Sequence, residues 1–455
     1  VTGGTVNLNA EEGIAAFTAA TTLAFSNTTN DVQVTNTLAG GVTVSGTNAG
    51  TGAVTITETA GNLTVGAGDI TTNSGVVTLT ASAADADIIA AFGSNVVTTG
   101  GPTAGAAITL TADNMSLAGA ITAGTGLVTL TPNADAQGIQ IGLGAVDDAL
   151  TLGLTAVELN LITTTGGVTI GSTTNDGGIT VVGAANLTTG GITGGTLTLR
   201  QDAGSIAVND TLTSPIATTL NTTSGNITFD PNGAITATGL TVSLTATGGN
   251  IEGDAVPFTN VTASTLNATA STGIGNTNAL ETNVTTLSVI NGATAGAITI
   301  TEANDVSVSG SNAFAAGAVS ITTTDGSITV NATNLSSNNG VITLTANDAT
   351  ADNSTPTGIT VTGTITSGGG AINLLAADDI ALGANVNATA GTVTITADSA
   401  AQDTAADADG AITRTAGTVT GGTVNLNAEE GIAATTAVTT LSVINGATAG
   451  AITIT

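Results

Sequence analysis

The chain has 455 residues and a formal net charge of −30, which comes from 32 acidic residues set against two arginines. A chain this poor in cations cannot neutralise phosphate groups, so nucleic acid and anionic membrane surfaces are not expected as partners. The sequence also lacks Cys, His, Trp, Tyr and Lys, which excludes disulfides, thiolate metal sites and Ser-His or Cys-His catalysis.

Disorder is not expected either, because 41% of the residues are apolar and only 7% are charged. The apolar residues are mainly Val, Ile, Leu and Ala, with Thr beside them, and this mixture favours strands. Aromatic residues make up 1% of the chain, so the core must be narrow. No apolar run approaches the about 18 to 20 residues of a membrane span, and membrane insertion is therefore not expected.

Short strands are predicted wherever the pattern Gly-x-apolar-Thr-apolar-Thr occurs. An alternation with a period of two is typical of a strand with one buried face. In chain order the main examples are residues 54–56, 77–79, 108–110, 128–130, 168–170, 197–199, 227–229, 319–321 and 393–395.

Second short strands lie between many of these, for example at residues 63–65, 206–208 and 328–330. Consecutive main strands are often about 18 to 23 residues apart, which is close to the coil length of repeat solenoids. Each coil is expected to carry two or three strands separated by Gly, Asn or Asp turns.

The sequence therefore predicts an all-β fold, a parallel β-helix or solenoid of about 20 to 22 coils. The alternative is a tandem array of β-sandwich domains, which also combine short strands with frequent turns. Three features favour the solenoid: the pattern persists along the whole chain, helical segments with ordinary caps are not expected, and the predicted interior residues are uniformly small or β-branched.

Longer copies divide the chain into modules. Residues 1–16 (VTGGTVNLNAEEGIAA) recur letter for letter at 419–434, an offset of 418, and residues 284–301 (VTTLSVINGATAGAITIT) recur at 438–455, an offset of 154. We assign residues 1–20 to the end of one repeat module, 21–284 to a long module, 285–438 to a short module and 439–455 to the start of the next. Both ends fall within copied text, which predicts that the solenoid continues in both directions.

Three phrases carry a resemblance: AVELNLITTTGGVTIG at 156–171, TGIGNTNALETNVTTLSV at 272–289 and ITITEANDVSVSG at 298–310. They resemble filamentous-haemagglutinin-type proteins, the large bacterial exoproteins and adhesins rich in β-strand repeats, and the similarity in style covers nearly the whole chain. The resemblance implies a right-handed parallel β-helix, export to the cell surface, and work as an adhesin shaft or a biofilm matrix fibre.

Carboxylates are the main groups that could carry chemistry. Adjacent pairs such as Asp147-Asp148 and Asp378-Asp379 point to opposite faces of a strand, so we expect no catalytic pair and no enzyme.

Calcium is the one cofactor considered, since Asp-rich loops offer the hard oxygen ligands that Ca²⁺ prefers. The candidate ligands are Asp85, Asp87, Asp403, Asp407 and Asp409. The alternative is that these carboxylates only keep the loops hydrated, because no EF-hand or calcium-binding nonapeptide spacing occurs.

Two functions stay open. The first is a structural component of an extracellular or cell-surface fibre or adhesin stalk, part of a longer repetitive exoprotein that continues or associates with itself. The second is a surface-binding module whose outward Thr and Asn ladders bind polysaccharide or a cell surface, with calcium assisting.

Overall fold

The computed structural model describes all residues except 99–103, 257, 350–356, 404–409 and 447–449. The chain divides into two units, and each is described by itself. Unit 1 is Val1–Gly225 with Asn232–Ala237, and unit 2 is Asn226–Pro231 with Thr238–Thr455. Within each unit the chain winds into successive coils, and the strands of neighbouring coils pair in parallel.

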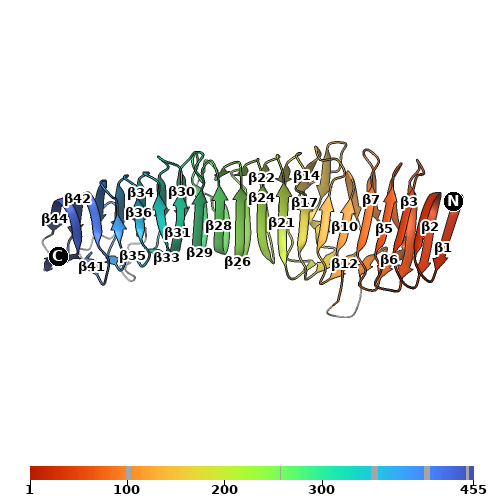
Figure 1. The fold of residues 1–455 in the computed structure, drawn as a ribbon, viewed down its shortest axis with the longest axis horizontal. Coiled ribbons are helices and arrows are strands. Elements are labelled where there is room, and N and C mark those ends of the chain that lie inside the picture. Colours follow the sequence, from red (N-terminus) through yellow and green to blue (C-terminus); the bar gives the residue numbers. More distant parts are fainter. Residues whose placement is uncertain (99–103, 257, 350–356, 404–409, 447–449) are drawn as a thin grey trace. The chain divides into compact units, whose positions relative to one another are not determined.

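Unit 1 has one row that takes a strand from each coil, here named row 1A. Figure 1 shows its first members side by side in red to orange. The row consists of β2 (Ile14–Asn27), β3 (Val32–Asn36), β5 (Val54–Glu58), β7 (Val77–Ala81), β10 (Ile108–Thr111), β13 (Val128–Thr131), β17 (Val168–Gly171), β21 (Thr196–Gln201) and β24 (Ala217–Thr222).

The other faces of unit 1 are built, in its described residues, from further strands and one helix, α1 (Ala156–Leu159). The strands are β1 (Thr2–Ala10), β4 (Val42–Asn48), β6 (Leu63–Thr72), β8 (Asp87–Ala90), β9 (Val96–Thr98), β11 (Asn114–Leu117), β12 (Ile121–Gly124), β14 (Gly138–Ile141), β15 (Thr151–Leu154), β16 (Ile162–Thr164), β18 (Ile179–Val181), β19 (Ala185–Asn186), β20 (Gly191–Ile192), β22 (Ile206–Val208), β23 (Thr211–Thr213) and β26 (Ala234–Ala246), whose first residues belong to this unit.

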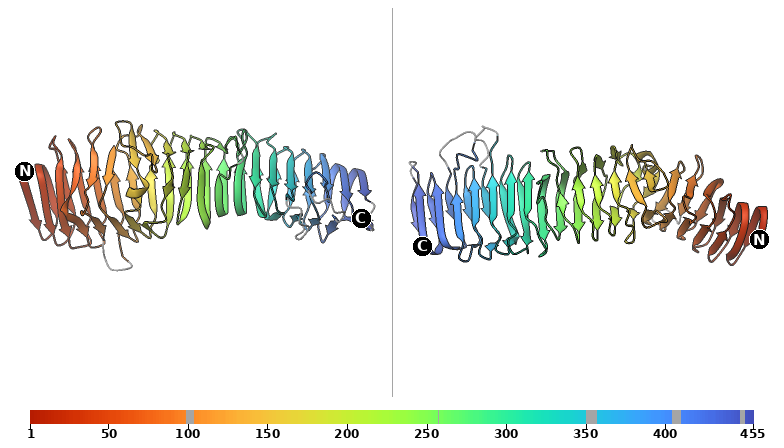
Figure 2. Two further views of the ribbon diagram at one scale, coloured as in Figure 1. Left: turned by 180° about the vertical axis from the view of Figure 1, so that it is seen from behind. Right: turned by 90° about the horizontal axis from the view of Figure 1, so that it is seen from above.

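Unit 2 has the same kind of main row, row 2A, and the two views of Figure 2 show its strands as neighbours. Two long strands, β28 (Val261–Ala270) and β29 (Leu280–Asn291), pair with each other. The first residues of β29 (280–282) pair with β30 of row 2A, and residues 286–291 pair with β31, so that Val289 to Asn291 begin the row named 2C below. Row 2A consists of β25 (Ile227–Phe229), β27 (Ile251–Glu252), the single residue Ile274, β30 (Ile298–Glu302), β32 (Val319–Thr323), β34 (Ile342–Ala346), β37 (Ile372–Ala376), β40 (Thr392–Thr396), β42 (Val419–Ala428) and β44 (Thr436–Asn445).

Two further rows complete unit 2. Row 2B consists of the first part of β31 (Val306–Asn312), the first part of β33 (Ile328–Ser337), β35 (Ile359–Val361), β38 (Ile380–Leu382), β41 (Ile412–Arg414), β43 (Ile432–Ala434) and β45 (Ile452–Ile454). Row 2C consists of the second parts of β31 and β33, then β36 (Ile365–Ser367), β39 (Val386–Asn387), and the first residues of β42 and β44.

The core of each unit is made by the apolar positions of the predicted alternation. Ile56, Leu79 and Leu110 of row 1A are fully buried, and so are Ile321 and Leu344 of row 2A. The Thr and Ser residues between them face outward. Full burial of one such aliphatic side chain contributes about 1.5 to 3 kcal/mol, so stacked rows of Val, Ile and Leu hold the coils together without aromatic residues.

The prediction of a parallel solenoid is confirmed, and the β-sandwich alternative is wrong. Sandwich sheets are antiparallel, whereas the ladders between successive coils here are parallel. The expected absence of capped helices is also wrong, because α1 begins at Thr155 with a capping box completed by Glu158. The division between the units falls near residue 230, inside the module assigned to 21–284.

Coil length varies more than the predicted 18 to 23 residues. Paired positions are 18 residues apart at Ile14 and Val32, and 23 apart at Val54 and Val77. The longer coils have offsets of 31 (Val77 to Ile108), 40 (Val128 to Val168) and 29 (Val168 to Leu197) in unit 1, and of 30 (Ile342 to Ile372) and 31 (Val393 to Val424) in unit 2. Coils with insertions contain more residues, and the rows therefore hold slightly fewer coils than a uniform repeat of about 20 residues would give.

The repeated 18 residues lie in different rows in their two copies, both within unit 2. In the first copy Val289 lies in row 2C and Ile298 in row 2A. In the second copy the equivalent Val443 lies in row 2A and Ile452 in row 2B. Both copies form a strand, a turn and a second strand. The repeated sequence therefore specifies a strand-turn-strand unit but not the row in which each strand stacks.

Candidate functional site

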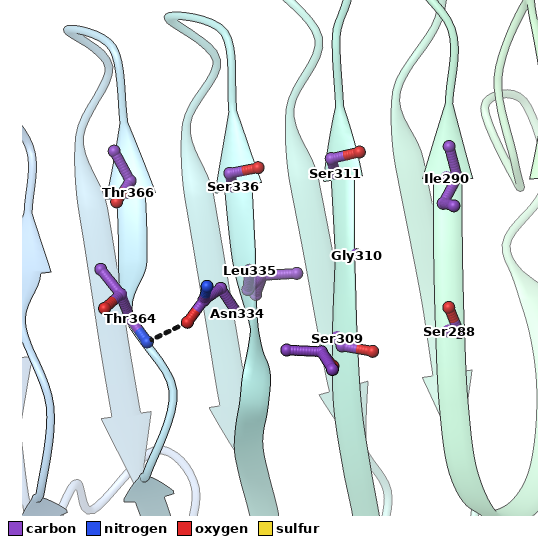
Figure 3. A pocket seen from close by; sticks show the side chains of 11 residues that line it. Ser288, Ile290, Ser309, Gly310, Ser311, Asn334, Leu335, Ser336, Thr364 and Thr366 are labelled. Carbon is purple, nitrogen blue, oxygen red and sulfur yellow. Dashed lines mark hydrogen bonds between the residues drawn. The ribbon is translucent and has the colours of Figure 1, made fainter.

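A shallow groove crosses four coils of unit 2 and has a volume of about 640 Å³. Figure 3 shows the side chains that line it, aligned from strand to strand. We name it the hydroxyl groove, since it is lined mainly by Ser288, Ser309, Ser311, Thr333, Ser336, Thr364 and Thr366, with Ile290, Gly310, Asn334 and Leu335 between them.

The groove exists because the ladder is irregular at Gly310. The register between β31 and β33 shifts between Val308 and Gly310, and Gly310 has a φ of 150° that side-chain-bearing residues rarely adopt. Asn334 has a φ of 72°, and its Oδ1 accepts a hydrogen bond of 2.8 Å from the amide of Thr364. The extra residues lie on β33, where Val330 and Leu335 are opposite Val308 and Gly310, and the bulge they form, which includes Asn334, borders the hollow.

The chemistry of the hydroxyl groove is that of a neutral binding surface. Ile290, Ser311, Ser336 and Thr366 form one row across paired strands, at the ladder spacing of about 4.8 Å. Hydroxyls both donate and accept hydrogen bonds, and the 45% exposed Ile290 adds an apolar contact. None of the lining residues titrates near neutral pH, so general acid or base catalysis has no group here.

A second hollow, of about 560 Å³, lies in unit 1 beside the insertion of the 40-residue coil. We name it the insertion pocket. Its apolar walls include Phe92, which is 95% exposed, and Val157 of α1. Its acidic groups are Asp147 and Glu158. The insertion places β15 in a parallel pair with β14 of the same coil, and α1 follows directly.

Glu158 is held by structural hydrogen bonds. Its carboxylate accepts from the amide and hydroxyl of Thr155, both at 2.8 Å, and from the amide of Leu117 at 3.0 Å. It thus caps α1 and also ties it to β11. The sequence contains the capping-box motif for this helix start, Thr-x-x-Glu at 155–158. Sequence reasoning missed it because the surrounding residues follow the period-two pattern of strands.

Asp147 is the second acidic group of the insertion pocket. Burial raises the pKa of Asp147 to about 6, with smaller contributions from the charges of Glu158 and Asp87, while hydrogen bonds from backbone amides lower it. One of those amides is that of Gly153, at 2.7 Å. Its sequence neighbour Asp148 instead accepts from the amide of Leu150, so the adjacent carboxylates serve different turns.

The predicted calcium ligands of unit 1 lie in different hydrogen-bond networks. Asp85 Oδ1 accepts from Asn114 Nδ2 at 3.1 Å. Asp87 Oδ2 accepts from Asn62 Nδ2 at 2.8 Å. Each contact bridges neighbouring coils, and calcium binding at these two residues stays a prediction.

In unit 2, Asp403 is buried, and its backbone forms an isolated parallel β-bridge with that of Asp348. Asp407 and Asp409 lie outside the described residues. Across the part of the chain that the structure describes, no group of three or more acidic side chains is placed to share a metal ion.

Sequence reasoning missed the buried carboxylates of unit 2. Glu302 is fully buried at the end of β30, and Asp254 is 5% exposed after β27. No motif marks these residues. Glu302 accepts hydrogen bonds from Thr282 and Val284 of the preceding coil, and only the ladder register could have placed these partners.

Comparisons of the chain with protein-family models, with curated proteins and with solved structures find no match. In the described ranges, no helix has the length and apolar character to cross a bilayer.

Proposed function

We propose that this chain is a structural segment of an extracellular or cell-surface fibre or adhesin stalk, and that it belongs to a longer repetitive exoprotein. The placement of one 18-residue text on two different rows supports this proposal. A sequence whose copies stack on more than one face is suited to extending a solenoid. A catalytic centre needs each group in one fixed place.

The experiment is electron microscopy of the purified chain together with diffraction from dried, aligned material. Filaments, and a meridional reflection near about 4.8 Å from strands stacked along the long axis, are the expected results. Compact particles without filaments would overturn the fibre proposal.

A second candidate function is polysaccharide or cell-surface binding, and the hydroxyl groove favours it. Its hydroxyls recur from coil to coil, as does the hydrogen-bonding surface of a sugar polymer. Retardation in gels containing a neutral polysaccharide, such as dextran or a β-glucan, measures this binding directly.

The test uses the double variant Ser311→Val and Ser336→Val, which removes two groove hydroxyls on neighbouring coils. The matched control is Ser320→Val with Thr343→Val, a pair on neighbouring coils of row 2A. Binding should disappear in the groove variant and persist in the control. Equal retardation of both variants, or none in the unmodified chain, would exclude the groove as a polysaccharide site.

A further inference from the structure

Unit 2 buries two carboxylate oxygens that have no hydrogen-bond partner, Asp254 Oδ2 and Glu281 Oε2. Asp254 is 5% exposed, and its other oxygen is fixed by the amide of Val256 at 2.8 Å. Glu281 is half-buried on β29. Burial raises the pKa of Glu281 to about 7, and the charge of Asp254 adds to the rise.

The backbone brings the two residues together from different coils. The amide of Asn260 donates to Glu281 O at 2.9 Å, and the amide of Glu281 donates to Asn260 Oδ1 at 3.1 Å. A Cβ on Gly253 would lie 1.8 Å from Ala279 O and 2.9 Å from Asn260 Oδ1. Only glycine permits this close approach, and it places Asp254 next to the segment that carries Glu281.

Leaving two carboxylate oxygens buried, close together and unpaired is costly, because charge removed from water needs a partner of opposite sign or a hydrogen-bond donor. Unit 2 offers little help. Its one basic residue, Arg414, lies on β41, which pairs with β38 and β43. Asp254 and Glu281 lie on earlier coils of the unit.

We propose that Asp254 and Glu281 bind a divalent cation of the Ca²⁺ class. Oxygen ligands of this kind suit a hard cation, and water can complete the coordination that two carboxylates begin. The cation would neutralise the buried pair and cross-link the coil after β27 to β29. The site uses none of the Asp-rich loop residues that the sequence singled out, and it does not depend on the proposed fibre function.

The experiment compares thermal unfolding in EDTA with unfolding in CaCl₂, at matched ionic strength, by calorimetry or circular dichroism. The chain has no Trp or Tyr to report by fluorescence. At a calcium concentration about a hundredfold above Kd, mass action should raise Tm by on the order of 5 °C. The variants Asp254→Asn and Glu281→Gln should each lose this rise.

The matched control is Glu302→Gln, which alters a buried glutamate whose oxygens already accept hydrogen bonds. It should keep the calcium response. Equilibrium dialysis with radioactive calcium should also show about one equivalent fewer bound to folded Asp254→Asn than to the unmodified chain. A calcium response equal in Asp254→Asn and the unmodified chain, or none in either, would overturn the proposal; in the second case a proton neutralises the pair.

Discussion

Glu302 shows how a buried carboxylate can contribute to the pH response of this protein. Its Oε2 accepts from Thr282 Oγ1 at 2.6 Å, and amides of Val284, Ala303 and Asn304 donate to the carboxylate at 3.0 to 3.3 Å. Burial raises the pKa of Glu302 despite these hydrogen bonds. The folded state therefore holds a proton at pH values where the unfolded chain has lost it.

The sign of the expected pH dependence follows from that shift. A carboxyl group with a raised folded pKa gives its full stabilisation below its ordinary pKa, and this is lost as pH rises through the folded pKa. We expect a larger free energy of unfolding at pH 5 than at pH 8. Urea titrations followed by circular dichroism would measure it. The difference should shrink in Glu302→Gln, whose amide cannot ionise; an unchanged difference in that variant would contradict the assignment.

Gly310 is a second residue whose identity the backbone dictates. Its φ is 150°, and an added Cβ would lie 1.9 Å from Val289 O on the neighbouring coil. We expect Gly310→Ala to lower the free energy of unfolding by about 2 to 4 kcal/mol, combining backbone strain and a steric clash. Gly40→Ala is the control, because nothing lies within 4 Å of a Cβ placed there. Equal stabilities of the two variants would argue against the constraint.

At the scale of elements, buried asparagines link one coil to the next. Asn291 Nδ2 donates to Asn312 Oδ1 at 3.0 Å, and both residues are buried. Each amide also bonds turn carbonyls, including Gly296 O from both side chains. The same contact joins Asn27 and Asn48 in unit 1 at 3.1 Å. These ladders satisfy the backbone where the chain turns between faces.

Removing one ladder member should therefore be costly. We expect Asn312→Ala to lower the free energy of unfolding by about 2 to 4 kcal/mol, because several buried partners lose their hydrogen bonds together. Asn338→Ala, which removes two exposed bonds, one donated to Ala313 O and one accepted from Asn339 Nδ2, should cost less than about 1 kcal/mol. Chemical denaturation of both variants would test this, and a comparable loss in both would show that the ladder adds nothing beyond a surface contact.

The two copies of the 18-residue text allow a comparison in which the amino acids are held constant. β29 of the first copy is mostly buried at alternate positions, whereas β44 of the second copy is mostly exposed. Intrinsic amide exchange rates are the same, so differences in hydrogen exchange report local stability alone. We expect slower exchange in residues 284–291 than in the identical residues 438–445. Mass spectrometry of peptides that include the distinct flanking residues would measure it, and equal rates would contradict the burial difference.

The same comparison shows what the sequence can predict. The period-two pattern located the strands and their inward residues, because alternation fixes which side chains are buried. Row membership was not predictable, since Val289 and Val443 have identical neighbours yet stack on different rows. The pairing of Asp254 with Glu281 was equally hidden, because it depends on coil length, and insertions alter coil length without changing the local pattern.

At the scale of the whole molecule, the scarcity of cations leaves trypsin only two cleavage points, Arg200 and Arg414. Both lie within strands, and a protease must open the local structure to reach them. Arg200 pairs with residues on both neighbouring strands, Gly171 and Asn221. Arg414 pairs with Leu382 on one neighbouring strand. On the other side β41 pairs with β43 only through Ile412, so within the described strands Arg414 has no paired residue there.

This asymmetry predicts an order of cleavage. The folded chain should resist trypsin, and with increasing urea Arg414 should be cut before Arg200, because fewer ladder bonds must break around it. Short digestions at each urea concentration, read by mass spectrometry, should first yield a fragment ending at residue 414 and then one ending at residue 200. A variant with both Arg200→Lys and Arg414→Lys keeps two trypsin sites, and it should show the same order of cleavage if local opening controls that order. Simultaneous cleavage at both sites would instead mean that the two units open in a single transition.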